Sequence, residues 1–201
     1  LSRCSDHRES RCARMSARVL IVNGLPGVGK TTQAQALALR LGWPLLTKDM
    51  CKESLFDTLG WSDRAWSHKL SLASMALLFV WLEAELRAGR DCIVEANFES
   101  VRDTPRLHAL ATTYAVRWVQ LLVVCDGETL WQRHLARGAS GSRHPGHLEA
   151  AVATEMRDRL RVGRTDAVQL AAPCIELDTT DWRAIDIDDV CMRIQHAFAL
   201  H

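Results

Sequence analysis

Short apolar segments alternate with longer, more polar segments along the chain from Arg18 onward. The apolar segments are rich in Val, Ile and Leu, which is typical of strands that are buried on both faces of a sheet. They predict strands over residues 19–22, 44–47, 92–95, 116–124 and 173–177. The intervening segments predict helices over residues 30–41, 66–88, 101–113, 127–136, 148–161 and 185–200. Because strands alternate with helices, we expect a parallel sheet with right-handed crossovers, in a three-layer α/β sandwich.

These elements predict a single domain over residues 15–201, since no repeat or linker divides them. Residues 1–14 (LSRCSDHRESRCAR) are polar, Arg-rich and without period. We therefore expect a disordered extension there, which is a cloning or upstream-translation remnant if Met15 is the native start.

The overall composition excludes several classes of protein. Twenty-five basic and 24 acidic side chains give a net charge of +1, so no global field recruits nucleic acid or a membrane. The seven Cys form no CxxC pair, which favours reduced thiols over a disulfide framework or a zinc site. The most apolar segment, residues 70–82, is too short to span a bilayer, and the N-terminus does not resemble a signal peptide. A cytoplasmic protein is expected.

A phosphate-binding motif follows the first predicted strand. Gly24-Leu-Pro-Gly-Val-Gly-Lys30-Thr31 matches G-x-x-x-x-G-K-[ST] without a mismatch, and a helix is predicted from Lys30. Glycines let successive backbone N–H groups turn toward phosphate oxygens, and the helix N-terminus adds positive potential. Lys30 can reach the β- and γ-phosphates, and Thr31 can ligate Mg²⁺. The predicted nucleotide-binding residues are Gly24, Pro26, Gly27, Val28, Gly29, Lys30, Thr31 and Thr32.

Two classes of P-loop protein do not fit the rest of the chain. GTPases would carry an Asn-Lys-x-Asp guanine reader, which is absent from the sequence. Motor-type ATPases usually end a strand with Asp-Glu, whereas the third predicted strand ends Glu95-Ala96-Asn97. The small kinase class remains, in which an acid faces the acceptor and a basic lid closes over ATP.

Acidic residues at the ends of two strands are candidates for this chemistry. Asp49 follows the second strand and can accept the proton of an acceptor hydroxyl, or it can cap the helix that begins there. Glu95, at the end of the third strand, can hold Mg²⁺ or can be a solvated acid. Asn97 and Phe98 are expected to line the acceptor pocket.

The predicted lid covers about residues 133–150. Arg133 and Arg137 lie four residues apart and lead into a Gly/Ser/His loop that contains Arg143. Guanidinium groups that close over a transferring phosphoryl group stabilise its transition state, so Arg133 and Arg137 join Lys30 and Asp49 as catalytic candidates. Arg133 and Arg143 are also predicted to bind the nucleotide; the alternative is a solvated helix face. Asp178, after the fifth strand, can contact adenine or form a plain turn.

This set of motifs resembles a known group. The P-loop, Asp49, the EANF stretch from Glu95 and the RHPGH stretch from Arg143 are similar to those of the small bacterial P-loop kinases of the AAA_33 type, relatives of chloramphenicol phosphotransferase and the zeta-toxin kinases. The resemblance covers about residues 16–182 and implies a five-stranded parallel sheet in the order 2-3-1-4-5. It also implies transfer of the γ-phosphate of ATP to a hydroxyl, with Asp49 as base and Arg133 and Arg137 on phosphate.

The resemblance does not identify the acceptor, because residues 50–69 show no acceptor signature. The leading hypothesis is a Mg²⁺- and ATP-dependent kinase of a small hydroxylated molecule, with antibiotics and natural products among the candidates. The alternatives are a nucleoside, nucleotide or polynucleotide 5′-hydroxyl kinase and a nucleotide-gated binding module without transfer activity. The net charge argues against long nucleic acid. The oligomeric state is left open.

Overall fold

Five parallel strands form one sheet in the order β2-β3-β1-β4-β5, as predicted. The computed structural model describes residues 16–141 and 143–200, so the predicted N-terminal extension lies outside the described residues. Its strands are β1 (Ala17–Gly24), β2 (Leu45–Thr47), β3 (Cys92–Glu95), β4 (Val116–Val124) and β5 (Cys174–Asp178). β3 lies between β1 and β2, although β1 and β2 are consecutive in the chain, and β1 is the central strand of the sheet.

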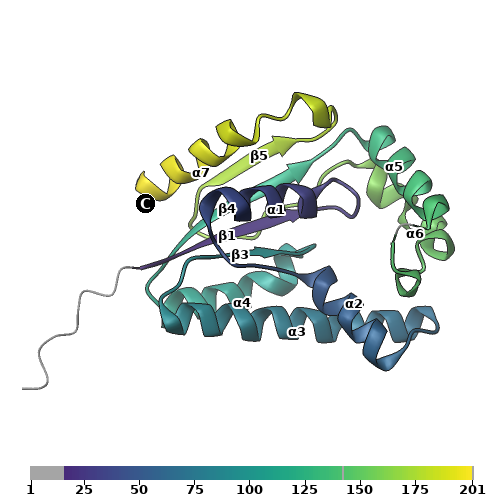
Figure 1. The fold of residues 1–201 in the computed structure, drawn as a ribbon, viewed down its shortest axis with the longest axis horizontal. Helices are drawn as coiled ribbons and strands as arrows, with labels where there is room; N and C mark the ends of the chain where they lie inside the picture. Colours follow the sequence, from purple (N-terminus) through teal and green to yellow (C-terminus); the bar gives the residue numbers. More distant parts are fainter. Residues whose placement is uncertain (1–15, 142, 201) are drawn as a thin grey trace, which may run out of the picture.

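Helices cover both faces of this sheet (Figure 1). One face carries α1 (Lys30–Leu41) and α7 (Ile187–Leu200), and the other carries α3 (Arg64–Ala88) and α4 (Ser100–Thr113). The remaining helices, α2 (Lys48–Leu59), α5 (Gly127–Ser140) and α6 (Glu149–Arg161), lie toward the end of the sheet where the strands terminate. The three-layer α/β architecture is confirmed.

Alternation along β1 explains why the sheet has a core on each side. Leu20 and Val22 belong to the apolar cluster that includes α1 and α7, whereas Val19 and Ile21 belong to the cluster that includes α3. All four side chains are fully buried. Successive side chains of a strand point to opposite faces, so a continuous apolar run is what a strand between two helical layers requires.

Most element bounds lie within two residues of the predicted ones; the larger differences are helix α2, for which no range is predicted, and the C-terminal end of α5. α1 and β4 have the predicted bounds. α5 continues to Ser140, four residues beyond the prediction, and therefore takes in the first part of the predicted loop. The rest of that loop contains a short 3₁₀ turn over Pro145–His147. Among the described residues, the structure has no helix long and apolar enough to cross a membrane.

Candidate active site

The P-loop connects β1 to α1 at the carboxyl end of the central strand. Gly24, Gly27 and Gly29 have φ values of +154°, +88° and +90°, which side chains with a Cβ rarely adopt. At Gly24 a Cβ would also lie 2.4 Å from the carbonyl oxygen of Val123 on β4. Glycine at this position therefore lets the chain turn while the two strands stay paired.

Lys30, the first residue of α1, is buried beneath this loop. Its Nζ donates to the carbonyl oxygen of Leu25 at 2.8 Å and lies 3.9 Å from Oε1 of Glu95. Burial lowers the pKa of Lys30 to about 8, although the nearby carboxylates of Glu95 and Asp49 oppose the shift. The ammonium group is therefore the predominant form at pH 7 and faces the loop that would hold phosphate.

Glu95, the last residue of β3, meets Thr31 at the start of α1. Oγ1 of Thr31 donates to Oε2 of Glu95 at 2.9 Å. Burial raises the pKa of Glu95, and the neighbouring Lys30 opposes that shift. A hydroxyl and a carboxylate are oxygen donors of the kind that Mg²⁺ prefers, and Mg²⁺ usually takes few protein ligands beside substrate phosphates. The pair fits a Mg²⁺ site that phosphate oxygens would complete.

Asp49 lies in the first turn of α2, and it is not the N-cap. Thr47 caps this helix, since its hydroxyl accepts from the backbone N–H of Met50 at 3.0 Å. Oδ2 of Asp49 accepts instead from Nη2 of Arg143 at 2.5 Å. Burial alone would raise the pKa of Asp49, but the cationic Arg143 and Lys30 outweigh it and hold the pKa below its ordinary value. The alternative that Asp49 serves as the helix cap is therefore wrong.

The prediction that Phe98 lines the acceptor pocket is wrong. Its side chain is buried in the core on the α3 side, where its ring makes an edge contact with Phe79 at 6.3 Å between centroids. The backbone of Phe98 is held by Asn23, whose Oδ1 accepts from its N–H and whose amide donates to its carbonyl oxygen. Asn97 precedes Phe98 in this loop and is half-buried, so its acceptor role stays a prediction.

Arg137 and Arg143 come together around one carboxylate, Glu149 at the start of α6. Nε and Nη2 of Arg137 both contact Glu149, with Nε at 2.9 Å, and Nε of Arg143 lies 3.4 Å from Oε1 of the same residue. A Cβ built on Gly27 of the P-loop would lie 3.8 Å from Nη2 of Arg137. Two guanidinium groups of the lid thus lie between the P-loop and Asp49.

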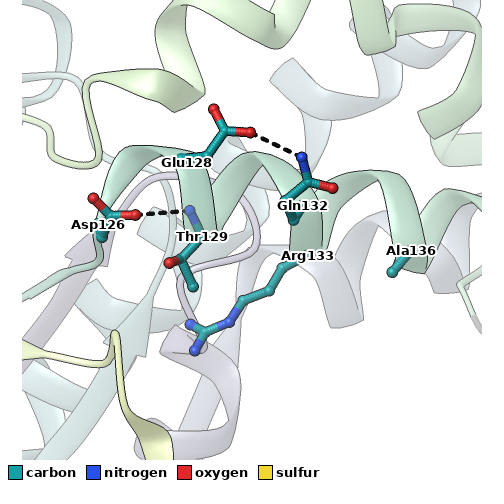
Figure 2. Close-up of a pocket in the computed structure, with 6 residues that line it drawn as sticks. All are labelled: Asp126, Glu128, Thr129, Gln132, Arg133 and Ala136. Atoms are coloured by element: carbon teal, nitrogen blue, oxygen red, sulfur yellow. Dashed lines mark hydrogen bonds between the residues drawn. The ribbon is translucent and has the colours of Figure 1, made fainter.

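Arg133 does not share this position, so its predicted role on phosphate beside Arg137 stays a prediction. Its Nη2 donates to the carbonyl oxygens of Thr179 and Thr180 at 2.9 Å each, and its Nη1 lies 3.3 Å from Sγ of Cys125. Figure 2 shows Arg133 extending from α5 beside a shallow depression of about 500 Å³ on that helix. Arg133 therefore links α5 to the segment that follows β5.

A second cleft, of about 460 Å³, is also lined by Arg133 and lies between the P-loop and the segment after β5. Its walls combine P-loop backbone, the start of α1 and apolar side chains. The lining includes Gly27, Val28, Gly29, Thr32, Gln33, Arg133, Thr179, Trp182, Ile185 and Ile187. Asp178 is not among these lining residues, and its Oδ1 accepts from the N–H and the hydroxyl of Thr180. The turn interpretation of Asp178 is therefore favoured over contact with a base.

Thr179 connects the segment after β5 to the P-loop, a role that the sequence did not predict. Its hydroxyl is buried and lies 2.7 Å from the carbonyl oxygen of Val28 and 3.0 Å from that of Val124. The available signal was a Thr that directly follows an acid at the end of a strand, here the edge strand β5.

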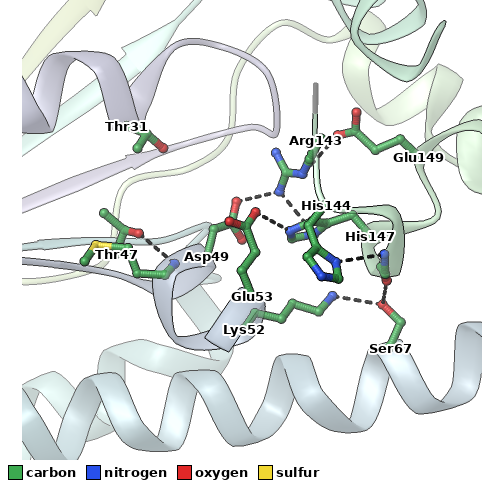
Figure 3. Close-up of polar contacts among 12 residues, drawn as sticks. Thr31, Thr47, Asp49, Lys52, Glu53, Ser67, Arg143, His144, His147 and Glu149 are labelled. Atoms are coloured by element: carbon green, nitrogen blue, oxygen red, sulfur yellow. Dashed lines mark hydrogen bonds and ion pairs between the residues drawn. The ribbon is translucent and has the colours of Figure 1, made fainter. Parts of the chain in front are cut away.

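The lid segment 143–147 is seated on α2 and α3 (Figure 3). The ring of Phe56 stacks on His144, with centroids 5.0 Å apart. Nζ of Lys52 donates to the hydroxyl of Ser67 at 3.0 Å, and that hydroxyl donates to the carbonyl oxygen of Gly146 at 3.0 Å. Burial lowers the pKa of Lys52 to about 8. The residues after Asp49 therefore form the seat of the lid.

Replacing Gly146 with Ala is expected to destabilise the folded protein by about 1–3 kcal/mol, the usual cost of overpacking a tight contact. A Cβ at Gly146 would lie 2.7–2.8 Å from three carbon atoms of the Phe56 ring. Chemical denaturation of G146A measures the loss. The same substitution in a Phe56→Leu background is the control, because the smaller side chain leaves room for the methyl group; an equal loss in both backgrounds contradicts the contact.

Comparison with known proteins agrees with this architecture. A candidate kinase from Chloroflexus aurantiacus J-10-fl has a TM-score of 0.82 and 35% identity, over 90% of this chain and 98% of that chain. Kti12 from Chaetomium thermophilum, in complex with ADP-AlF₃, has a TM-score of 0.60 and 20% identity, over 90% and 98%. A sugar kinase from Janibacter sp. HTCC2649 has a TM-score of 0.51 and 14% identity, over 89% and 91%. No curated protein matches the chain.

The sheet order, the P-loop and these neighbours define a P-loop NTPase with a kinase-like fold. Residues 19–162 match AAA_33, a family described as an AAA domain, and the chain belongs to that family.

Proposed function

We propose that the protein is a phosphotransferase that moves the γ-phosphate of ATP to a hydroxyl of a small molecule, with antibiotics and natural products among the candidate acceptors. The observation that carries the proposal is the convergence of Lys30, Arg137, Arg143 and Asp49 at the carboxyl edge of the sheet. A binding module needs the P-loop, whereas a carboxylate facing two lid arginines across that loop is what transfer to a hydroxyl requires.

Some of these residues would bind the phosphate donor, ATP, and others would act on the hydroxyl acceptor. The P-loop backbone and Lys30 would hold the phosphates, and Arg137, beside Gly27, would balance the charge that develops on the transferred group. Thr31 and Glu95 would hold Mg²⁺, which supplies charge neutralisation at the phosphate oxygens when bound. Asp49, kept as a carboxylate, would accept the hydroxyl proton of the acceptor.

We further propose that residues 15–201 act as one domain in which about 133–150 form the lid, and that the reaction takes place in the cytoplasm because ATP is the donor. The seating of the lid on α2 supports this division, since it places the lid over Asp49. Arg133 and the cleft beside it are proposed to receive the base of the nucleotide.

The direct test is a transfer assay with γ-labelled ATP and Mg²⁺ across aminoglycosides, macrolides, nucleosides and sugars, with ATP hydrolysis in the absence of acceptor as the baseline. Labelled product with a sugar or antibiotic supports the proposal. Labelled nucleoside or oligonucleotide ends favour the 5′-hydroxyl kinase instead. Nucleotide binding without transfer to any acceptor or to water favours the binding module.

Arg137→Ala and Arg133→Ala are expected to have different kinetic effects. Arg137 is expected to act on developing charge, so its loss should lower kcat by up to roughly 10³-fold, with a smaller effect on the KM for ATP. Arg133 holds two backbone carbonyls at the wall of the second cleft, so its loss should mainly raise the KM for ATP. Steady-state kinetics on both variants separate the two roles. Equal losses of kcat in the two variants would instead indicate that Arg133 and Arg137 both act on the transferred phosphate.

A further inference from the structure

Three groups hold the guanidinium of Arg143 (Figure 3). Its Nη2 lies 2.5 Å from Oδ2 of Asp49 and 3.2 Å from Nδ1 of His147, and its Nε lies 3.4 Å from Oε1 of Glu149. Two of these contacts are ion pairs with carboxylates. The contact with His147 is of another kind, because a histidine ring can donate or accept.

The contact of the second ring nitrogen of His147 determines whether Nδ1 donates or accepts. Its Nε2 lies 2.8 Å from Oε1 of Glu53 on α2. A carboxylate can only accept, so Nε2 carries the proton, and Nδ1 is left with a lone pair that accepts from Nη2 of Arg143. The side chain of His147 is only 7% exposed. Burial and the neighbouring Arg143 lower the pKa of His147 to about 3, so the ring is neutral at pH 7.

These contacts form one hydrogen-bonded series, Glu53–His147–Arg143–Asp49, which begins and ends on α2. Glu53 and Asp49 are four residues apart on that helix and therefore share a face. Arg143 and His147 stand on either side of the Pro145–Gly146 turn, whose carbonyl oxygen at Gly146 is bonded to Ser67 of α3. Both ends of the series are thus attached to the same rigid helix, and its middle is attached to a turn seated on α3.

We propose that His147 is a positioning residue that holds Arg143 on Oδ2 of Asp49. Within residues 16–141 and 143–200, no group donates a hydrogen bond to Oδ1 of Asp49. Arg143 therefore occupies one carboxylate oxygen and leaves the other for the acceptor hydroxyl. That last consequence rests on the proposed function, whereas the placement of Arg143 by His147 does not.

His144 provides a matched control in the same turn. Its Nδ1 accepts from the backbone N–H of Gly146 at 3.0 Å, and its Nε2 lies 3.2 Å from Oδ1 of Asp57. Its ring stacks on Phe56. His144 therefore helps to seat the lid, as His147 does, but it makes no contact with Arg143 among the described residues.

The test follows the titration of the Asp49 carboxyl by ¹³C NMR in the full chain without ligand, compared with Asp49→Asn for assignment. The charged and titratable groups that face Asp49 come from the lid, α1, β3 and α2, and they are Arg143, His147, Lys30, Glu95, Lys48, Lys52 and Glu53. The pKa of Asp49 lies below its ordinary value and that of His147 is about 3, so the two groups titrate in the same range, and replacing His147 also removes a charge from this set. A difference in the pKa of Asp49 between two variants that both lack the imidazole ring therefore reports a movement of Arg143.

Two substitutions of His147 separate its two nitrogens. His147→Gln keeps an amide donor near the position of Nε2 for Glu53 but places no acceptor near the position of Nδ1, so the pKa of Asp49 is expected to rise by about 1 or more as the guanidinium moves away. His147→Asn places an amide oxygen near the position of Nδ1, so the low pKa is expected to be retained. His144→Gln is expected to leave it unchanged.

A second variant guards against failure of His147→Gln to fold. Glu53→Ala removes a carboxylate whose charge by itself raises the pKa of Asp49, so a merely electrostatic effect would lower that pKa. A rise in Glu53→Ala reports the release of Arg143. The proposal is overturned if the pKa of Asp49 is no higher in His147→Gln than in His147→Asn and Glu53→Ala does not raise it, or if His144→Gln raises it as much as His147→Gln does. This readout needs no acceptor, so it can fail while phosphotransfer is demonstrated, and it can succeed where no transfer is found.

Discussion

Lys30→Ala is expected to lower phosphotransfer by at least about 10²–10³-fold and to weaken the binding of Mg·ATP, while the protein stays folded. Nζ of Lys30 is buried beneath the P-loop and is the cation nearest to Glu95, at 3.9 Å. Its removal leaves the phosphates without that charge. The fold should survive, because Glu95, whose pKa burial already raises, can take up a proton in place of its lost partner.

The measurements are calorimetric binding of Mg·ATP, turnover and thermal unfolding. Lys69→Ala is the matched control, since Lys69 is an exposed lysine of α3. Unchanged affinity and turnover in Lys30→Ala would contradict the assignment of the phosphate site. A loss of both that is accompanied by unfolding would show only that Lys30 supports the structure, and Lys30→Met would then be measured instead.

The sequence predicts the fold well because its signals are local and repeated. A strand buried on both faces needs an apolar run, and β1 has one over its predicted residues 19–22. The start of α1 is marked by the P-loop motif, and its end is marked by Gly42 in the left-handed conformation. α5 was predicted four residues too short, because Ser and Gly near its end are typical of a loop while lid contacts keep it helical.

The placement of the lid arginines could not be predicted from spacing. Residues four apart on a helix share a face, which suggested a single role for Arg133 and Arg137. They are also separated by about one helical turn along the axis, or about 6 Å. Arg133 therefore reaches the carbonyls after β5, whereas Arg137 reaches Glu149. Which partner each one meets depends on elements that are distant in the sequence.

The same reason explains the error at Phe98 and the omission of Glu149 and His147. Phe98 follows a strand end, where ligands bind in such sheets, but an aromatic ring there can equally close the core, and Phe79 of α3 receives it. Glu149 lies 12 residues from Arg137, and no periodic pattern joins them. His147 was visible in the RHPGH stretch, but its role depends on Glu53, 94 residues away.

Asp49→Asn is expected to leave Mg·ATP binding nearly unchanged and to lower phosphotransfer by roughly 10²–10⁴-fold, the usual range for the loss of a general base. Asn keeps the shape of Asp but removes the charge and the proton acceptor. ATP binding should be largely kept, because the phosphate contacts come from the P-loop after β1, whereas Asp49 follows β2. Helix α2 should also be kept, since Thr47 and not Asp49 is its cap.

Asp57→Asn is the matched control for this experiment, because Asp57 is an exposed acid on the same helix that meets His144 and not Arg143. Calorimetric binding of ATP and a transfer assay with the identified acceptor are measured on both variants. A large loss of transfer in Asp49→Asn alone, with binding intact, assigns the proton acceptor, and it also distinguishes a kinase from a nucleotide-gated module. Intact transfer in Asp49→Asn removes Asp49 from the mechanism, and the next candidate is Glu95, the buried carboxylate nearest to Lys30.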